Sequence, residues 1–272
     1  MIKHRISVSL LLLLMLAGCG SAPPRQPAAL EQAGKTEQAA HRAMRDGDLL
    51  RARELFHQSM LMQQALDNAP ARAQAAINLA SVSHKLGDDA AALAVLEPIL
   101  NEDKPPYPGE LRAAAALRKA IILADGGKPA DAAWQQAQQE CHQSCGYRAG
   151  IANLGARLAL ARGDHASALA LAQQGLAASP GQDEQANALR LSAVAETALG
   201  QQDKALAHYQ GALEIDTSLG LSRRIAADLH GMAEVLGKLG RVDDAAQYAR
   251  RAAAVDEAIS SLSASAGKRA IP

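Results

Sequence analysis

Two cysteines four positions apart form the cluster most suggestive of chemistry, in the order Cys141-His142-Gln143-Ser144-Cys145. In an exported protein, neighbouring cysteines usually form a disulfide. Residues four apart on a helix have Cα atoms about 6 Å apart, which is within bridging range. Gly146 follows directly, and a helix that ends there relaxes the side-chain directions. We therefore predict a structural Cys141–Cys145 disulfide.

Two other interpretations of this cluster stay open. Free thiols are the second interpretation, although a redox dithiol more often reads C-x-x-C within a βαβ unit, which the sequence lacks. A metal site comes third, because a closed site needs four ligands and only Cys141, His142 and Cys145 are local. We expect no metal and no cofactor.

The third cysteine, Cys19, follows a short basic stretch at 3–5 and an apolar run at 6–16. The run is too short for a membrane-spanning helix and has the layout of a secretory signal. The site Leu16-Ala17-Gly18-Cys19 resembles the bacterial lipobox. The alternative is an ordinary secretory signal that happens to contain a cysteine.

The lipobox resemblance implies cleavage before Cys19 and three acyl chains on that residue, enough for nearly permanent anchoring. Gly20 follows, where an Asp tends to retain lipoproteins in the inner membrane. The resemblance therefore implies the outer membrane, with the protein facing the periplasm. The proline-rich stretch 22–27 is typical of an extended tether.

Composition excludes several classes of protein. The 28 basic and 28 acidic residues balance, so there is no basic excess for binding nucleic acid. Aromatic residues make up 2% of the chain, which leaves few platforms for stacking bases or sugars. Alanine and leucine dominate, and period-two strand patterns are absent, which indicates an all-α protein.

An element of 36 to 40 residues recurs along the chain, consisting of an apolar helical stretch, a glycine, and a second helix with an alanine five positions later. The glycines are Gly47, Gly87, Gly127, Gly163, Gly200 and Gly240, and the alanines are Ala52, Ala92, Ala132, Ala168, Ala205 and Ala245. A fixed period in this range predicts a solenoid. Glycine can end the first helix in a left-handed conformation, and alanine lets the paired helices approach closely.

This pattern resembles the tetratricopeptide repeat (TPR), most clearly from Ala198 to Leu213 and from Asn78 to Asp88. The resemblance implies a right-handed superhelical solenoid of about six helix-turn-helix repeats. The repeats depart from the family in exceeding its usual length of about 34 residues, and they lack the bulky aromatic residue early in the first helix.

The expected organisation has four parts. Residues 1–18 form a signal peptide, 19–31 a lipidated cysteine with a flexible tether, 32–261 the repeat domain and 262–272 a disordered tail. Three prolines make 101–109 a loop between repeats 2 and 3.

The resemblance also implies that the first helix of each hairpin lines a concave groove. In the register of the glycines, the groove positions are His41, Arg45, His84, Lys85, Asn153, Arg157, Arg190, His230, Glu234 and Lys238. Repeat 3 contributes mainly Leu117, Ile121 and Asp125. An apolar middle flanked by cations favours acidic or carboxylate-bearing segments of a partner.

We therefore predict a protein-binding scaffold or assembly factor for an envelope complex, and not an enzyme, since no nucleophile–base pair or metal set is evident. TPR lipoproteins that pilot pilus secretin assembly or recruit cell-wall enzymes share this architecture. The alternative is a periplasmic thiol or metal-responsive protein that uses Cys141 and Cys145.

Overall fold

The computed structural model describes residues 27–101, 107–142, 145–178 and 181–269. These residues form twelve helices and no strand. The helices are α2 (Ala28–Arg45), α3 (Leu49–Ala65), α4 (Ala69–Lys85), α5 (Asp89–Asn101), α6 (Gly109–Asp125), α7 (Asp131–Glu140), α8 (Arg148–Ala161), α9 (His165–Ala177), α10 (Gln182–Ala198), α11 (Gln202–Leu219), α12 (Ser222–Lys238) and α13 (Val242–Arg269). The predicted signal peptide and Cys19 lie outside the described residues.

The helices pair into six consecutive hairpins, from α2–α3 to α12–α13, as the repeat pattern predicts. All six repeat glycines lie at the hairpin turns and have positive φ angles between 66° and 83°. At Gly87, for example, φ is 83°, a conformation that a residue with a Cβ adopts only with strain. The glycine spacing therefore located every hairpin turn.

The repeat alanines pack between the helices with one clear exception. Ala52, Ala92, Ala168 and Ala205 are fully buried and Ala245 is half-buried, whereas Ala132 is exposed and its neighbour Ala133 is buried instead. Pro129 explains this shift. It lengthens the turn after Gly127, so that α7 starts only at Asp131 and presents the next residue to its partner helix.

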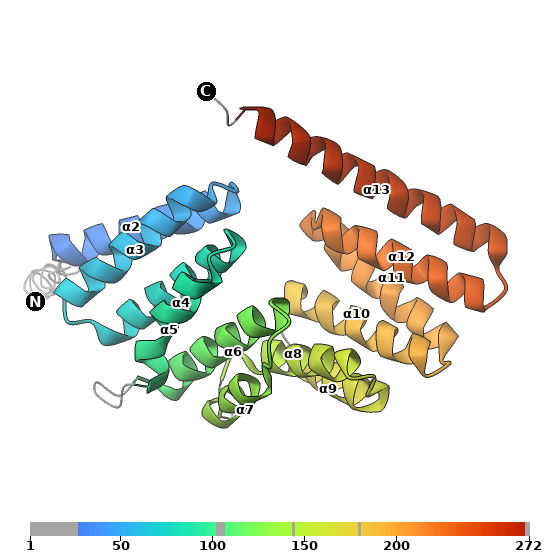
Figure 1. Ribbon diagram of the computed structural model, residues 1–272, viewed down its shortest axis with the longest axis horizontal. Coiled ribbons are helices and arrows are strands. Elements are labelled where there is room, and N and C mark those ends of the chain that lie inside the picture. Colours follow the sequence, from blue (N-terminus) through green and yellow to red (C-terminus); the bar gives the residue numbers. More distant parts are fainter. Residues whose placement is uncertain (1–26, 102–106, 143–144, 179–180, 270–272) are drawn as a thin grey trace, which may run out of the picture.

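The hairpins stack side by side into an arch (Figure 1). Each first helix contacts the next along the arch from α4 to α12, and each second helix also contacts the first helix of the hairpin that follows. The largest apolar cluster runs through the middle of the arch, from α4 to α8, and includes Leu96, Ile99 and Ile122. Smaller clusters flank it, one between α2 and α5 and others from α8 onward, so each repeat is packed mainly against its neighbours.

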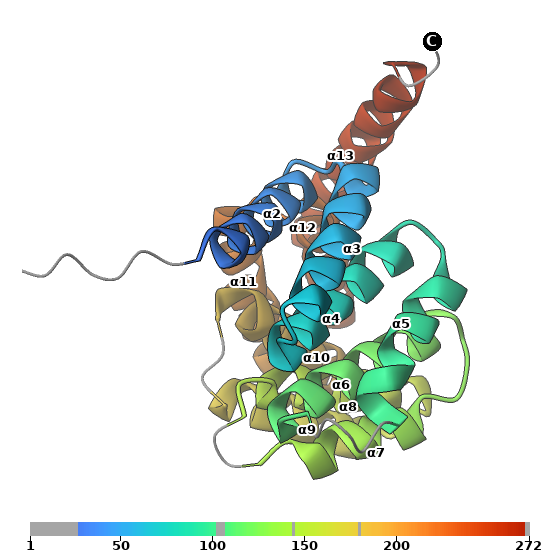
Figure 2. The same ribbon diagram turned by 90° about the vertical axis from the view of Figure 1, so that its left-hand side faces the viewer.

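Both ends of the helical array differ from the expected domain bounds. Helix α2 begins at Ala28, inside the expected tether. Helix α13 continues to Arg269, well past its partner α12, and projects from the body of the molecule (Figure 2). The sequence after Ser261 is rich in alanine and contains no proline before Pro272, so nothing in it forces an earlier end. None of the helices in the described ranges is long and apolar enough to cross a bilayer.

Candidate functional site

A cavity of about 470 Å³ runs along the inside of the arch, and its walls come from the first helix of every hairpin, α2, α4, α6, α8, α10 and α12, together with Tyr147 just before α8. We call it the inner groove. Of the ten predicted groove positions, Lys85, Asn153 and Arg157 line it, and the predicted apolar middle is present as Leu117 and Ile121. Its volume is that of a typical ligand-binding cleft.

One face of α6 forms the floor of the inner groove. Ala114, Leu117, Arg118 and Ile121 recur at intervals of three and four residues, so they share a face of the helix. Sequence reasoning followed the four-residue interval from Leu117 to Asp125 and missed Arg118. The alternative three-residue step from Arg118 to Ile121 was the signal that would have found it.

Arg118 is the most unusual charged group in the inner groove. Its Nε atom is buried and has no hydrogen-bond partner, and no carboxylate in the described part of the chain forms an ion pair with it. Burial lowers the pKa of the Arg118 guanidinium, and the more distant charges of Asp125 and Glu184 offset this only in part. The guanidinium remains charged, because arginine does not deprotonate in proteins at ordinary pH.

Asp125, at the end of α6, joins three first helices at the edge of the groove. Its carboxylate lies 3.0 Å from Nε2 of His84 on α4 and 2.7 Å from a guanidinium nitrogen of Arg157 on α8. Nδ1 of His84 lies 2.6 Å from Asp89. Burial lowers the pKa of His84, but the two aspartates outweigh it and raise the pKa overall. Two predicted groove residues, His84 and Arg157, are therefore already paired within the protein.

Asn153 lines the inner groove but is almost completely buried. Its side-chain amide donates to the backbone oxygen of Glu184 at 3.0 Å and to the Glu184 carboxylate at 2.7 Å. Its own amide oxygen faces Gly175 on α9, where a Cβ would come within 2.4 Å. Asn153 therefore joins α8 to α10 and is not a ligand contact.

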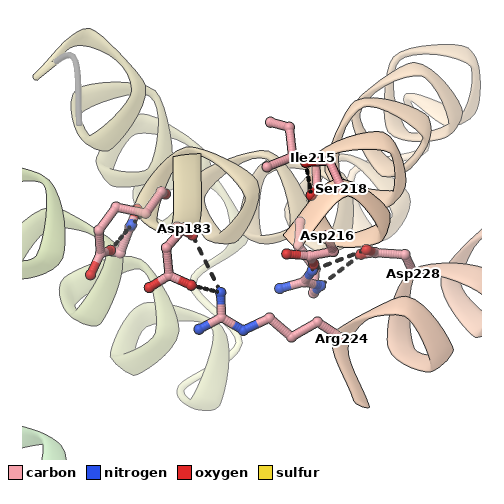
Figure 3. Close-up of polar contacts among 9 residues, drawn as sticks. Asp183, Ile215, Asp216, Ser218, Arg224 and Asp228 are labelled. Carbon is pink, nitrogen blue, oxygen red and sulfur yellow. Dashed lines mark hydrogen bonds and ion pairs between the residues drawn. The ribbon is translucent and has the colours of Figure 1, made fainter. Parts of the chain in front are cut away.

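Arg190 was predicted as a groove cation, and this prediction is wrong. Its guanidinium lies between Asp216 on α11 and Asp228 on α12. Both carboxylates are fully buried, and both pair with Arg190; Figure 3 labels the two aspartates. Nε of Arg190 donates to Asp228 at 2.6 Å, and a terminal nitrogen donates to both carboxylates. The Arg190 side chain points into the junction between α11 and α12, because its two anions lie there.

Burial raises the pKa of Asp228 to about 6, against the opposing effect of Arg190, while the nearby Asp216 raises it further. Two buried carboxylates share one guanidinium, so the cluster carries more negative than positive charge. This arrangement gives a structural ion cluster between α10, α11 and α12.

The remaining predicted positions do not line the inner groove. His41 packs edge-on against Phe56, with ring centroids 5.0 Å apart, and Arg45 is exposed at the end of α2. Nε2 of His230 lies 2.9 Å from Asp256 on α13, and Glu234 pairs with Lys238 at 2.7 Å. The superhelical twist turns these positions away from the shared cavity.

Three further charged residues of the inner groove were not predicted, Asp183, Glu184 and Arg224. Arg224 on α12 reaches across to the carboxylate and the backbone oxygen of Asp183 on α10 (Figure 3). Asp183 starts a stripe on α10 that continues through Asn187 to Leu191, at four-residue intervals. Helical spacing of three to four residues thus identifies the groove-lining face of α10, as it does for Arg118 on α6.

Cys141 and Cys145, the pair for which a bridge was predicted, are joined by a disulfide, with Cα atoms 5.3 Å apart. Helix α7 ends at Glu140, so Cys141 already lies outside regular helix and its side chain can turn toward Cys145. Sulfur atoms bonded to each other are neither thiolate ligands nor nucleophiles. Within the described ranges, no group of three or more His, Cys, Asp or Glu side chains is arranged to hold a metal ion.

Comparisons with known proteins agree with this geometry. Residues 184–258, which cover α10 to α12 and much of α13, match the tetratricopeptide repeat family. No curated protein matches the chain.

Among solved structures, the fold is similar to that of BtubC (BKLC) from P. vanneervenii, with 14% identity and a TM-score of 0.58 over 86% of this chain and 93% of that one. MamA has 15% identity and a TM-score of 0.49 over 67% of this chain and 97% of that one. The fold is therefore an all-α TPR solenoid, which supports a protein-interaction scaffold in general.

Proposed function

We propose that this protein is a lipid-anchored scaffold that binds acidic segments of a partner protein in its inner groove, facing the periplasm from the outer membrane. The observation that carries the proposal is the composition of the groove, to which all six first helices contribute. Four cations line it, Lys85, Arg118, Arg157 and Arg224, against the two anions Asp183 and Glu184. The whole chain has no such excess.

The pairing of these charges supports an acidic partner. Arg157 and Arg224 are paired with aspartates, and the Glu184 carboxylate accepts a hydrogen bond from Asn153. Lys85 and Arg118 form no ion pair among the described residues. A partner that presents carboxylates therefore meets two unmatched positive charges, a complementarity that accelerates encounter and selects against basic partners.

The anchor and the compartment rest on the sequence. The apolar run 6–16 and the lipobox-like site at Cys19 support lipid attachment, and the tether 22–27 would hold the domain away from the bilayer. The Cys141–Cys145 disulfide is compatible with an oxidising compartment such as the periplasm. An assembly factor for an envelope complex, such as a pilus secretin or a set of cell-wall enzymes, is the role that unites these features.

Site-specific photocrosslinking tests the use of the inner groove. A photoreactive amino acid at Ile121, on the groove floor, should crosslink to a partner in intact cells, and added salt should weaken capture after lysis. The matched control position is Leu61, which is exposed on the second helix α3. Crosslinks that form at Leu61 and not at Ile121 would place binding on the outer face and reject the proposal.

The anchor is tested separately. In Cys19→Ala, incorporation of labelled palmitate should cease, and the protein should leave the outer-membrane fraction because its acyl chains are absent. Fractionation identical to that of the unchanged protein would show that another feature holds it at the membrane.

A further inference from the structure

Arg118 lacks the partners that a buried arginine normally has. The described residues place no carboxylate within ion-pair distance of its guanidinium, and its buried Nε donates to nothing. Burying a charged group without a partner is unfavourable, so such groups are normally paired. The missing partner therefore identifies a position at which an anion would be stabilised.

The inner groove provides room for that anion directly beside Arg118. Leu117 and Ile121 flank Arg118 on the same face of α6, and Leu154 and Leu191 line the same cavity. A cavity of about 470 Å³ accommodates a few side chains of a bound segment. Its surface near Arg118 is thus an apolar floor with one half-buried positive charge.

Neighbouring charges define what kind of anion fits. Lys85, an exposed cation of the same cavity, is also without an ion pair in the described part of the chain. Asp183 and Glu184 belong to the α10 wall, where Arg224 and Asn153 hold them. One half-buried guanidinium beside apolar side chains matches a single planar carboxylate, which arginine binds through parallel hydrogen bonds. A phosphate group has three acceptor oxygens and would need more donors than this floor offers.

We propose that Arg118 binds the carboxylate of an internal acidic side chain in a partner polypeptide, while an adjacent apolar side chain of that segment packs on Leu117 and Ile121. This proposal rests on the proposed function of the groove and specifies the motif that the groove recognises. Lys85, which is exposed, adds long-range attraction, whereas Arg118 supplies the discrimination, because its guanidinium is the less exposed of the two charges.

Binding to blocked peptides tests the proposal with the full-length protein in detergent. The probe is a short fluorescent peptide of leucine, serine and glutamate, with an acetylated amino end and an amidated carboxyl end. A matched peptide has glutamine in place of glutamate. Fluorescence anisotropy should give about tenfold or greater preference for the glutamate peptide, the effect of a charge-assisted hydrogen bond in a partly dry site. The blocked ends exclude a terminal carboxylate as the source of binding.

Substitutions assign the preference to Arg118. In Arg118→Met the glutamate preference should disappear, and in Arg118→Lys part of it should remain. Lys119→Gln is the matched control, because this cation of α6 lies outside the inner groove and pairs with Glu97 at 2.9 Å, so the variant should keep the preference. Equal affinity of the unchanged protein for the two peptides, or a preference that survives Arg118→Met, overturns the proposal.

Thermal unfolding provides an independent measurement. Replacing Arg118 leaves no carboxylate without its counter-charge, because Arg118 forms no ion pair among the described residues. Arg118→Met should therefore melt at the same temperature as the unchanged protein or higher. A large drop in melting temperature would show that Arg118 is held by the fold and would overturn its role as a binding residue. If the carboxylate preference is absent while crosslinking at Ile121 persists, the scaffold function stands and only the recognition motif is wrong.

Discussion

Arg118 on α6 and Arg190 on α10 are both arginines on first helices, yet they have opposite surroundings. Arg190 lies between the buried carboxylates of Asp216 and Asp228, and all three groups are satisfied by one another except for one oxygen of Asp216. Arg118 faces the inner groove with no carboxylate beside it in the described residues. The same residue type thus stabilises the fold at one end of the array and leaves a charge available in the middle.

The difference extends to the regions around the two arginines. The region matched by the TPR family, 184–258, contains the ion cluster and a tightly packed Tyr209, whose ring lies against Gly231. Burial raises the pKa of Tyr209 to about 12. The central region contains the disulfide, the shortest helix α7 and the groove floor. The closely packed contacts thus lie in the region that matches the family, whereas the disulfide and the short helix α7 lie in the central region, together with the groove floor.

Replacing Arg190 should lower the free energy of unfolding more than any other substitution considered. Arg190→Met leaves two buried carboxylates without a counter-charge, so the free energy of unfolding should fall by about 3–5 kcal/mol. Denaturant unfolding followed by circular dichroism measures the loss. Arg118→Met is the matched substitution in the central region and should cause little loss. Equal destabilisation by both substitutions would remove the distinction between the two arginines.

The close packing of Tyr209 on Gly231 predicts the next largest loss of stability. A Cβ at position 231 would lie 2.2 Å from the Tyr209 ring, so Gly231→Ala should destabilise the protein by about 1–3 kcal/mol. Gly237→Ala on the same helix meets no atom within 4 Å and should be neutral or stabilising by up to about 1 kcal/mol. Thermal melts of the two variants give the sign of each effect, and a stabilising Gly231→Ala would contradict the described contact.

The disulfide predicts a smaller effect in the central region. Denatured, non-reduced protein should show no free thiol from Cys141 or Cys145, as measured by thiol titration. Replacing both cysteines by serine should cost at most about 2 kcal/mol, because the bridge closes a very short loop. Two titratable thiols at these positions would favour the alternative role as a thiol protein.

The last effect is a pH dependence of the free energy of unfolding that arises at the ion cluster. The folded pKa of Asp228 is about 6, above the value of about 3.9 for an unfolded aspartate. Between these values the folded state binds more protons than the unfolded state, so this group makes stability fall as pH rises from about 4 to about 6. Asp228→Asn should flatten that part of the profile of unfolding free energy against pH. An unchanged slope in the variant would assign the dependence to other groups.

The fold was predictable because its main determinants are local. The glycine spacing identified all six turns, since each needs a positive φ within a few residues of sequence. The burial of Ala132 was predicted wrongly because one proline, Pro129, lengthens a single turn and shifts the helix register. A strict count from glycine to alanine does not contain that information.

The candidate site was predictable only in part, because its charges depend on contacts between distant residues. Lys85 and Leu117 follow from the helical register and line the inner groove. The partners of Arg190 lie 26 and 38 residues away on two other helices, so their convergence depends on how the hairpins stack. Whether a given arginine is paired or unpaired is therefore a property of the three-dimensional array.

The bracket at Asp125 has a mechanical consequence. In a solenoid each hairpin contacts mainly the next, so small rotations between neighbouring hairpins add up along the array. Asp125 connects His84 on α4 with Arg157 on α8 and thereby braces three successive coils at one edge. These contacts oppose rotation between the hairpins that begin with α4, α6 and α8, and the other hairpin junctions have no such link through Asp125. The groove floor that carries Arg118 thus lies on the middle one of the three hairpins that Asp125 connects.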